Sequence, residues 1–246
     1  MALLCRRLLF PVTLLLLCVA QAHAGLVLHY AFDETSGTTA ADSSGSGNTG
    51  TLNGMTGAEW TTGRIGGALS FDGTNDYVEA IGYKGITGTG ARTVALWFKT
   101  SNSGVQMPLV DYGGFWLAVT ALNDAGITGG SNLTDGGWHH LAVTIPDNGN
   151  TGDVVLYVDG VGTNGSGTTP INTSPTTDVR LGKNVEHFNG LLDDVRFYNS
   201  ALSASEVGAL AYGASPEPAS VFASLGLLTA AGCGLREWRR RKKKAA

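Results

Sequence analysis

Carboxylates are the side chains of this 246-residue chain that could perform acid–base chemistry. Hydrolysis of a glycosidic bond uses two of them, about 5–5.5 Å apart when the configuration is retained. Side chains two positions apart share one face of a strand, so a Glu-x-Asp-x-Glu run would supply the pair. Instead, Asp193 and Asp194 are adjacent and are expected on opposite faces, and the glutamates are isolated at Glu34, Glu59, Glu79, Glu186 and Glu206. We therefore expect a protein that is not an enzyme.

Nucleophiles and metal-binding pairs are also scarce. No cysteine lies between Cys18 and Cys233, which excludes a cysteine nucleophile, a disulfide and a thiolate metal site from that stretch. His139 and His140 are neighbours on a predicted strand, so their side chains point to opposite faces and cannot share a metal. A structural role for both is the preferred interpretation.

Oxygen-rich turns are better suited to a cation, because Ca²⁺ binds carboxylate, amide and carbonyl oxygens. Two turns, at 72–76 and 147–153, have that composition. The second lacks the glutamate that an EF-hand needs at its twelfth position, where Val158 stands. We interpret it as a solvated hairpin.

Aromatic rings that stack on the apolar faces of sugars form another candidate site. Tyr112, Phe115 and Trp116 flank two glycines, so three rings gather near one turn. Alternation along a strand puts Phe115 and Trp116 on opposite faces, so one ring is expected outside and the other in the core. These three residues are the candidates for glycan binding.

Charge divides the chain into three segments, although the formal net charge is only −4. Residues 25–212 hold 18 Asp and Glu against 7 Lys and Arg, a net charge of −11. The first 24 residues carry +2 and residues 213–246 carry +5. A body this acidic excludes general binding of nucleic acid, which needs a basic surface. It would also repel acidic polysaccharides unless a cation bridged the two.

The N-terminal segment, 1–24, has the parts of a secretory signal peptide. Arg6 and Arg7 precede an apolar run at 8–20, and small residues follow at 22 and 24. We expect cleavage before Gly25, and a retained membrane anchor is the alternative.

The C-terminal segment, 213–246, combines a proline motif, an apolar stretch and a basic cluster. These parts occupy 216–220 (with Pro216, Glu217 and Pro218), 219–235 and 236–244. The apolar stretch is near the lower length limit for a membrane-spanning helix, and a basic cluster stays cytoplasmic, so the body would face outward. The three-part unit resembles the PEP-CTERM protein-sorting tail. That resemblance implies processing by an exosortase, and an ordinary tail anchor is the alternative.

Between these tails, short apolar runs alternate with turns rich in Gly, Asn, Asp, Ser and Thr, which tolerate positive φ angles. Expected strands cover 26–32, 68–71, 77–80, 93–99, 115–120, 138–145, 154–159 and 191–198. Ser203 and Glu206 form a capping box for one short helix that stops at Gly213. Strands at this spacing predict a single antiparallel sandwich.

Several motifs recur in a recognisable order. They are GLVLHYAFD at 25–33, DSSGSGNTGTLNG at 42–54, GALSFDGTNDYV at 67–78, VALWFK at 94–99, WHHLAVT at 138–144, VLYVDG at 155–160 and FNGLLDDVRFYN at 188–199. This set resembles the laminin-G-like branch of the concanavalin A-like lectin/glucanase superfamily over nearly all of 25–212. The resemblance implies an all-β, antiparallel jelly-roll sandwich with the first strand beside the last. The short membrane-spanning helix of the tail would be separate from it.

The resemblance also implies a cation site. Related jelly rolls often hold a structural calcium between carbonyls of the first strand and an aspartate that begins the last strand. Asp193 and the Asp33 region would be its ligands here. The alternative for Asp193 is an ordinary loop or edge carboxylate.

Together these features predict a secreted, non-catalytic surface or exopolysaccharide-matrix protein of a bacterial envelope that binds extracellular polysaccharide. It would be exported through the inner membrane, held there transiently by its tail, and sorted to the cell surface, outer membrane or matrix. An adhesive module that binds proteins and, less favoured, a glycoside hydrolase are the alternatives.

Overall fold

The computed structural model of this chain describes residues 25–103, 107–119 and 132–213. The predicted signal peptide and the sorting motif with Pro216, Glu217 and Pro218 lie outside these ranges, as do the expected span and basic cluster. Within the described ranges, no helix has both the length and the apolar character that a membrane span requires.

The described residues form short strands and one helix. In chain order the elements are β1 (Leu26–Tyr30), β2 (Thr39–Ala40), β3 (Gly50–Asn53), β4 (Trp60–Thr62), β5 (Gly67–Asp72), β6 (Tyr77–Ala80), β7 (Arg92–Lys99), β8 (Met107–Tyr112), β9 (Phe115–Val119), β10 (Trp138–Ile145), β11 (Val155–Val158), β12 (Val161–Asn164), β13 (Val179–Leu181), β14 (Asn189–Tyr198) and α1 (Ala204–Ala211). The prediction of an all-β domain with one short helix near its end is confirmed.

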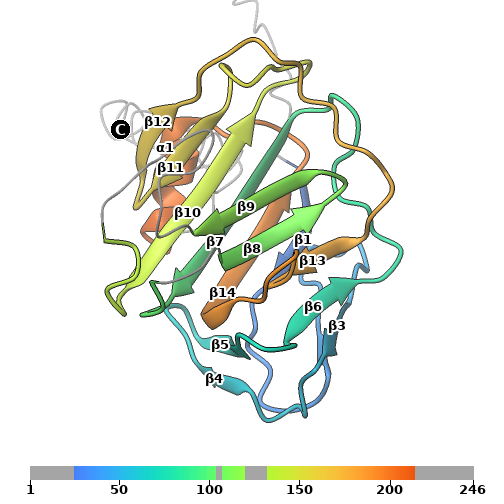
Figure 1. The fold of residues 1–246 in the computed structure, drawn as a ribbon, viewed down its shortest axis with the longest axis vertical. Helices are drawn as coiled ribbons and strands as arrows, with labels where there is room; N and C mark the ends of the chain where they lie inside the picture. The colour runs from blue at the N-terminus through green and yellow to red at the C-terminus, as the bar shows by residue number, and fades with distance from the viewer. Residues whose placement is uncertain (1–24, 104–106, 120–131, 214–246) are drawn as a thin grey trace, which may run out of the picture.

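The strands form two antiparallel sheets that pack face to face (Figure 1). One has eight strands in the order β12-β11-β10-β7-β14-β5-β4, with β1 also paired to β14. The other has six, in the order β2-β3-β6-β13-β8-β9. In Figure 1, β8 and β9 cross in front of β7 and β14, so the six-stranded sheet is nearer the viewer. The predicted sandwich, with the first strand beside the last, is confirmed.

Six strands within the described ranges are missing from the sequence prediction. They are β2, β3, β4, β8, β12 and β13, and four of these belong to the six-stranded sheet. β2 has two residues and β13 has three, too few to display an alternating pattern. β8 contains Pro108, which cannot donate to a ladder and argues against a strand. The sequence therefore predicts the eight-stranded sheet better than its partner.

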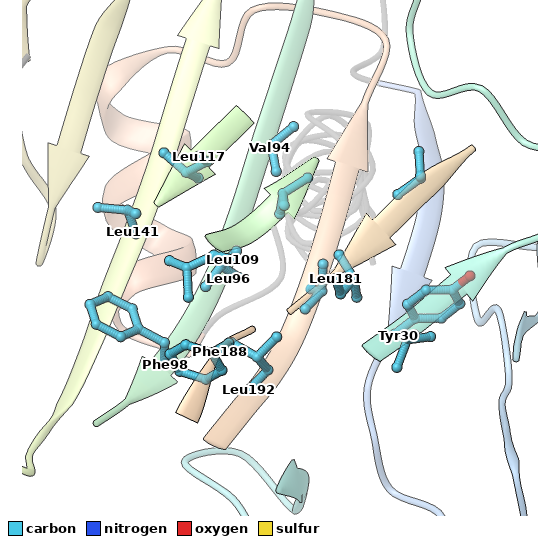
Figure 2. Packing of buried hydrophobic residues seen from close by; sticks show 14 of the residues in the cluster. Tyr30, Val94, Leu96, Phe98, Leu109, Leu117, Leu141, Leu181, Phe188 and Leu192 are labelled. Atoms are coloured by element: carbon cyan, nitrogen blue, oxygen red, sulfur yellow. The ribbon is translucent and has the colours of Figure 1, made fainter. Parts of the chain in front are cut away.

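The hydrophobic core fills the space between the two sheets (Figure 2). From the eight-stranded sheet, β7 contributes Val94, Leu96 and Phe98, all fully buried. Leu109 of β8 and Leu181 of β13 meet them from the facing sheet and are fully buried too. Burying each side chain of this size stabilises the fold by about 1.5–3 kcal/mol. The core thereby fixes which side chains of each sheet face outward.

Helix α1 covers part of the outer face of the eight-stranded sheet. The predicted capping box is present, because Glu206 N donates to Ser203 Oγ at 3.3 Å and Ser203 N donates to the Glu206 carboxylate at 2.7 Å. Val207 and Leu210 pack against side chains of β7, β10, β11 and β14. Since the helix covers one face and the core the other, seven of the eight residues of β7 are buried.

Candidate functional site

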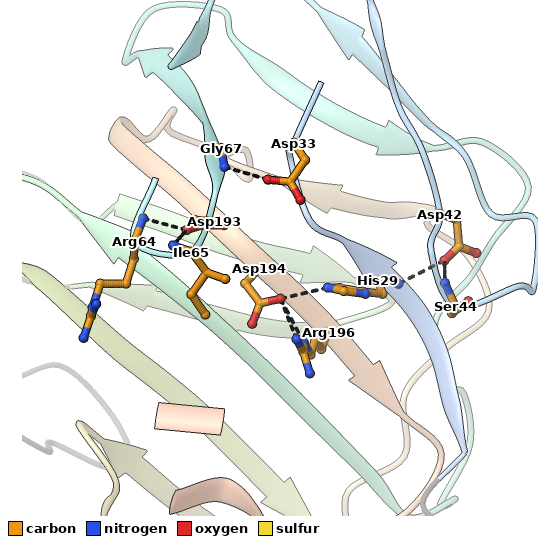
Figure 3. A network of polar contacts seen from close by, with 10 residues as sticks. All are labelled: His29, Asp33, Asp42, Ser44, Arg64, Ile65, Gly67, Asp193, Asp194 and Arg196. Carbon is orange, nitrogen blue, oxygen red and sulfur yellow. Dashed lines mark hydrogen bonds and ion pairs between the residues drawn. The ribbon is translucent and has the colours of Figure 1, made fainter. Parts of the chain in front are cut away.

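A β-bulge in β14 brings the adjacent aspartates onto one face. Asp193 pairs with Trp97 of β7, and Arg196 pairs with Ala95, so β14 advances three residues while β7 advances two. Asp194 has a φ of +50° and contacts Arg196 on the outer face (Figure 3). The expectation that the two aspartates point to opposite faces was wrong, because the extra residue interrupts the period of two.

Asp193 is fully buried beneath the turn that joins β4 and β5. Its Oδ2 accepts from Arg64 N at 2.7 Å and from Ile65 N at 2.8 Å (Figure 3). Its Oδ1 has no hydrogen-bond partner among the described residues. Burial raises the pKa of Asp193 to about 7, against the two backbone hydrogen bonds, and the charges of Asp194 and Asp33 add to the rise.

Asp33 lies against the same turn. Its Oδ1 accepts from Gly67 N at 2.6 Å. The neighbouring glycines are needed for this approach: Gly66 has a φ of +69°, and a Cβ there would collide with Asp33 Oδ1. A Cβ at Gly63 would lie 2.6 Å from Asp193 Oδ2. The structure thus brings both predicted cation ligands to one glycine-rich turn, 63–67.

The donor atoms at this corner bear on whether it could hold a cation. Within the described ranges, no group of three or more His, Cys, Asp or Glu side chains has the spacing of a metal site. A calcium ion, however, also binds backbone carbonyl oxygens. The carbonyl of Phe32 lies at this corner, so close to Gly67 that a Cβ at Gly67 would collide with it. A cation here would give Asp193 Oδ1 the partner that it lacks and would reduce the repulsion between Asp193 and Asp33.

Asp194 has a structural set of partners instead. Its Oδ1 lies 2.8 Å from His29 Nε2 and accepts from Arg196 Nη2 at 2.9 Å, which ties β1 to β14 (Figure 3). Burial disfavours its charge, but the hydrogen bond with His29 and the charge of Arg196 outweigh it and lower the pKa of Asp194. With Asp193 fully buried and Asp194 only 6% exposed, neither carboxylate of the pair is placed to reach a substrate.

The histidines of β10 lie on opposite faces, as predicted. His140 is buried in an edge contact with Trp97, their rings 5.2 Å apart, and burial lowers its pKa to about 4. The other ring, His139, lies 2.9 Å from Asp159 Oδ2 and 3.2 Å from Asp135 Oδ1. Both histidines therefore make structural contacts, on opposite faces of the strand.

The three candidate aromatic residues are brought together, but only one is open to a ligand. Tyr112 is fully buried, with its ring 4.9 Å from that of Phe115 and 5.8 Å from that of Phe197. Phe115 is half-buried against the core. Trp116 points outward from β9 and is 43% exposed. This geometry removes Tyr112 from the residues that could touch a sugar, because the register of β8 turns its ring inward.

Trp116 lines a pocket of about 250 Å³ at the edge of the six-stranded sheet. Pro108 of β8 and the turn residues Asn184, Val185 and Glu186 complete its walls. Asn184 Nδ2 donates to Asp111 Oδ1 at 3.1 Å, which fixes this turn beside β8. An aromatic ring, an amide and a carboxylate therefore border one hollow.

The pocket continues into a row of outward side chains across the six-stranded sheet, here named the outer row. Trp116 pairs with Asp111, Asp111 with Arg180, Arg180 with Glu79, and Glu79 with Thr51. Neighbouring strands lie about 4.8 Å apart, so three spacings from Trp116 to Glu79 span about 14 Å. Burial raises the pKa of Asp111, against the lowering effect of Arg180. The outer row offers hydrogen-bonding groups beyond the aromatic ring.

Trp116 could be predicted from the sequence, whereas Asp111, Arg180 and Asn184 were not among the predicted site residues. Alternation within β8 and β13 would have indicated which side chains face outward, but neither strand was predicted. The Arg180–Glu79 contact joins residues 101 positions apart, which no local pattern reveals.

The motifs, the two-sheet sandwich and the first-to-last strand pairing agree with the family comparison. The chain belongs to the concanavalin A-like lectin/glucanases superfamily, in the Laminin_G_3 family, which matches residues 72–208. No curated protein matches the sequence.

Solved structures share the fold. Domain 4 of AbnA, a GH43 extracellular arabinanase from Geobacillus stearothermophilus, in complex with arabinotriose, is 26% identical with a TM-score of 0.62, covering 76% of this chain and 98% of that one. The binding domain of Paraclostridial Mosquitocidal Protein 1 is 16% identical with a TM-score of 0.56, covering 76% and 52%. Trypanosoma rangeli sialidase in complex with sialic acid is 17% identical with a TM-score of 0.51, covering 76% and 32%. The last two similarities concern the fold alone.

Proposed function

We propose that this domain is a non-catalytic glycan-binding module that uses the outer face of its six-stranded sheet. The half-exposed Trp116 in its pocket is the observation that carries the proposal, because an accessible ring beside hydrogen-bonding groups suits a sugar. The similarity to an arabinanase domain in complex with arabinotriose supports it. Binding without catalysis is favoured by the burial of the adjacent aspartates.

A panel of immobilised polysaccharides, probed with the full chain in detergent, tests this function. We expect retention on at least one extracellular polysaccharide and loss of retention in the variant Trp116→Ala. No retention on any polymer would contradict glycan binding and favour the alternative of a protein-binding adhesive module.

We propose further that a structural calcium stabilises the corner at turn 63–67. Asp193 and Asp33 would hold the ion together with a nearby backbone carbonyl of the same chain. The positive charge of the ion would offset the negative charges of these two carboxylates. Ligand at 100 times its dissociation constant adds about 2.7 kcal/mol of stability. For a domain of this size that raises Tm by about 5–10 °C.

Calorimetric melting with calcium and with a chelator tests the cation. We expect a higher Tm with calcium in the wild type and no rise in Asp193→Asn. The matched variant Asp72→Asn, which changes a carboxylate at the end of β5, should keep the rise. An unchanged Tm of the wild type on chelation would refute the calcium proposal.

We also propose that the tails export and sort the protein. The signal peptide would be removed before Gly25, and an exosortase would act near Pro216, Glu217 and Pro218 after transient anchoring in the inner membrane. The mature protein would then reside at the cell surface or in the extracellular matrix. Mass spectrometry of the mature protein gives both termini. A product that keeps residues 221–246 would indicate an ordinary tail anchor.

A further inference from the structure

Two carboxylates flank the arginine of the outer row. Arg180 lies between Glu79 on β6 and Asp111 on β8. Its Nε donates to Glu79 Oε1 at 2.8 Å, and this bond, with the charges of Glu79 and Asp111, raises the pKa of the guanidinium. An incoming anion that reaches the guanidinium edge of Arg180 would lie between Glu79 and Asp111, whose charges repel it. Arg180 is therefore poorly placed to receive an anion.

Neighbouring cations are engaged in a similar way. Lys183 Nζ lies 4.0 Å from the centre of the Tyr77 ring in a cation–π contact. Lys84 Nζ is paired with Asp178 Oδ1 at 2.6 Å. Glu186 adds a further carboxylate to the wall of the Trp116 pocket. The side chains named here carry four negative charges, on Glu79, Asp111, Asp178 and Glu186, against three positive ones, on Arg180, Lys183 and Lys84. The carboxylates therefore outnumber the cations, as they do in the acidic body.

We propose that this site takes neutral polysaccharides and rejects polymers of uronic acids, and that Glu79 and Asp111 set the preference. The proposal rests on the glycan-binding function above and names its ligand class. Sugar hydroxyls both donate and accept, so they can bond to carboxylate and guanidinium edges without displacing the Arg180–Glu79 pair. A carboxylate on the sugar would meet like charge along the outer row instead.

Glu79 and Asp111 would select against acidic polymers by repelling their carboxylates. Asp111 accepts from Asn184 and faces Arg180, whose positive charge favours the ionised carboxylate against the effect of burial. Replacing Glu79 and Asp111 by their amides keeps the shape and removes two negative charges. Arg180 would then be the dominant charge of the outer row and would attract an anion.

A matched pair of ligands gives the sharpest test: a neutral polysaccharide that the wild type retains, and the same polymer after its primary alcohols are oxidised to carboxylates. Affinity for both is measured with the full chain by calorimetry or affinity electrophoresis, in chelator and at two salt concentrations. The test variant combines Glu79→Gln with Asp111→Asn. The control combines Asp147→Asn with Asp153→Asn, which removes two charges from the turn between β10 and β11 of the other sheet.

The wild type should bind the neutral polymer at least tenfold more tightly than its oxidised form, with the ratio shrinking at high salt. The Glu79/Asp111 variant should reduce that ratio at least tenfold, while the control keeps it. Equal or tighter binding of the oxidised polymer by the wild type, or an unchanged ratio in the Glu79/Asp111 variant, would overturn the proposal and leave glycan binding intact. Retention of no polymer at all would overturn the proposed function itself, and this inference with it.

Discussion

Truncation of Trp116 to alanine is the substitution that most directly perturbs the pocket. A tryptophan side chain offers about 250 Å² at most, and Trp116 is 43% exposed. About 110 Å² is therefore available, and a sugar stacked on one face of the ring would cover about half of it. At about 25 cal/mol per Å², the lost contact amounts to about 1.4 kcal/mol. That free energy corresponds to about a tenfold weaker Kd.

Isothermal calorimetry with the polysaccharide that binds best measures this change. Because the ring is outside the core, Trp116→Ala should leave Tm nearly unchanged, which separates binding from folding. Tyr212→Ala is the matched control, since Tyr212 is an aromatic residue 86% exposed at the C-terminal end of α1, on the side of the eight-stranded sheet. An unchanged Kd in Trp116→Ala, or an equal loss in Tyr212→Ala, would refute the placement of the site.

Three further substitutions test the account of the fold. Asp194→Ala should cost about 3–5 kcal/mol in urea unfolding because it removes the carboxylate partner of Arg196, whose side chain is only 12% exposed; a loss under about 1 kcal/mol would contradict the ion-pair role. Although burial opposes the charge, hydrogen bonds to two carboxylates raise the pKa of His139 above 6.5. The charged His139 therefore stabilises the fold fully below pH 6.5, and this contribution is lost as the pH rises through the raised pKa. His139→Gln should thus lower the free energy of unfolding more at a pH of about 6 than at a pH of about 9. Equal costs at both pH values would exclude a charged His139. Phe188→Ala, at a fully buried ring, should lower the free energy of unfolding by about 3–5 kcal/mol, whereas a change within experimental error would place Phe188 outside the core.

The eight-stranded sheet could be predicted from the sequence because its long strands bury apolar side chains in recognisable runs. β7 and β10 have eight residues each, and the predicted limits of β10 agree with the structure. The six-stranded sheet could not be predicted as well, since its strands are short and one includes Pro108. Those short strands owe their conformation to tertiary pairing, which local pattern does not display.

The candidate site, like the fold, could be predicted only in part from the sequence. Trp116 could be chosen because an aromatic residue beside two glycines is visible in the sequence. Tyr112 was chosen on the same ground, yet the unpredicted strand β8 turns it into the core. The shared face of Asp193 and Asp194 depends on a bulge, and a left-handed residue other than glycine leaves no clear signal for it.

Chemical-shift mapping tests the central claim most directly. An oligosaccharide of the best-binding neutral polymer is titrated into the isotopically labelled chain. We predict that the indole N–H of Trp116 and the backbone amides of β8, β13 and β6 shift together and saturate at one Kd. Shifts confined to β10–β12 and α1, on the opposite side of the sandwich, or no shift at any resonance, would contradict glycan binding at the outer row.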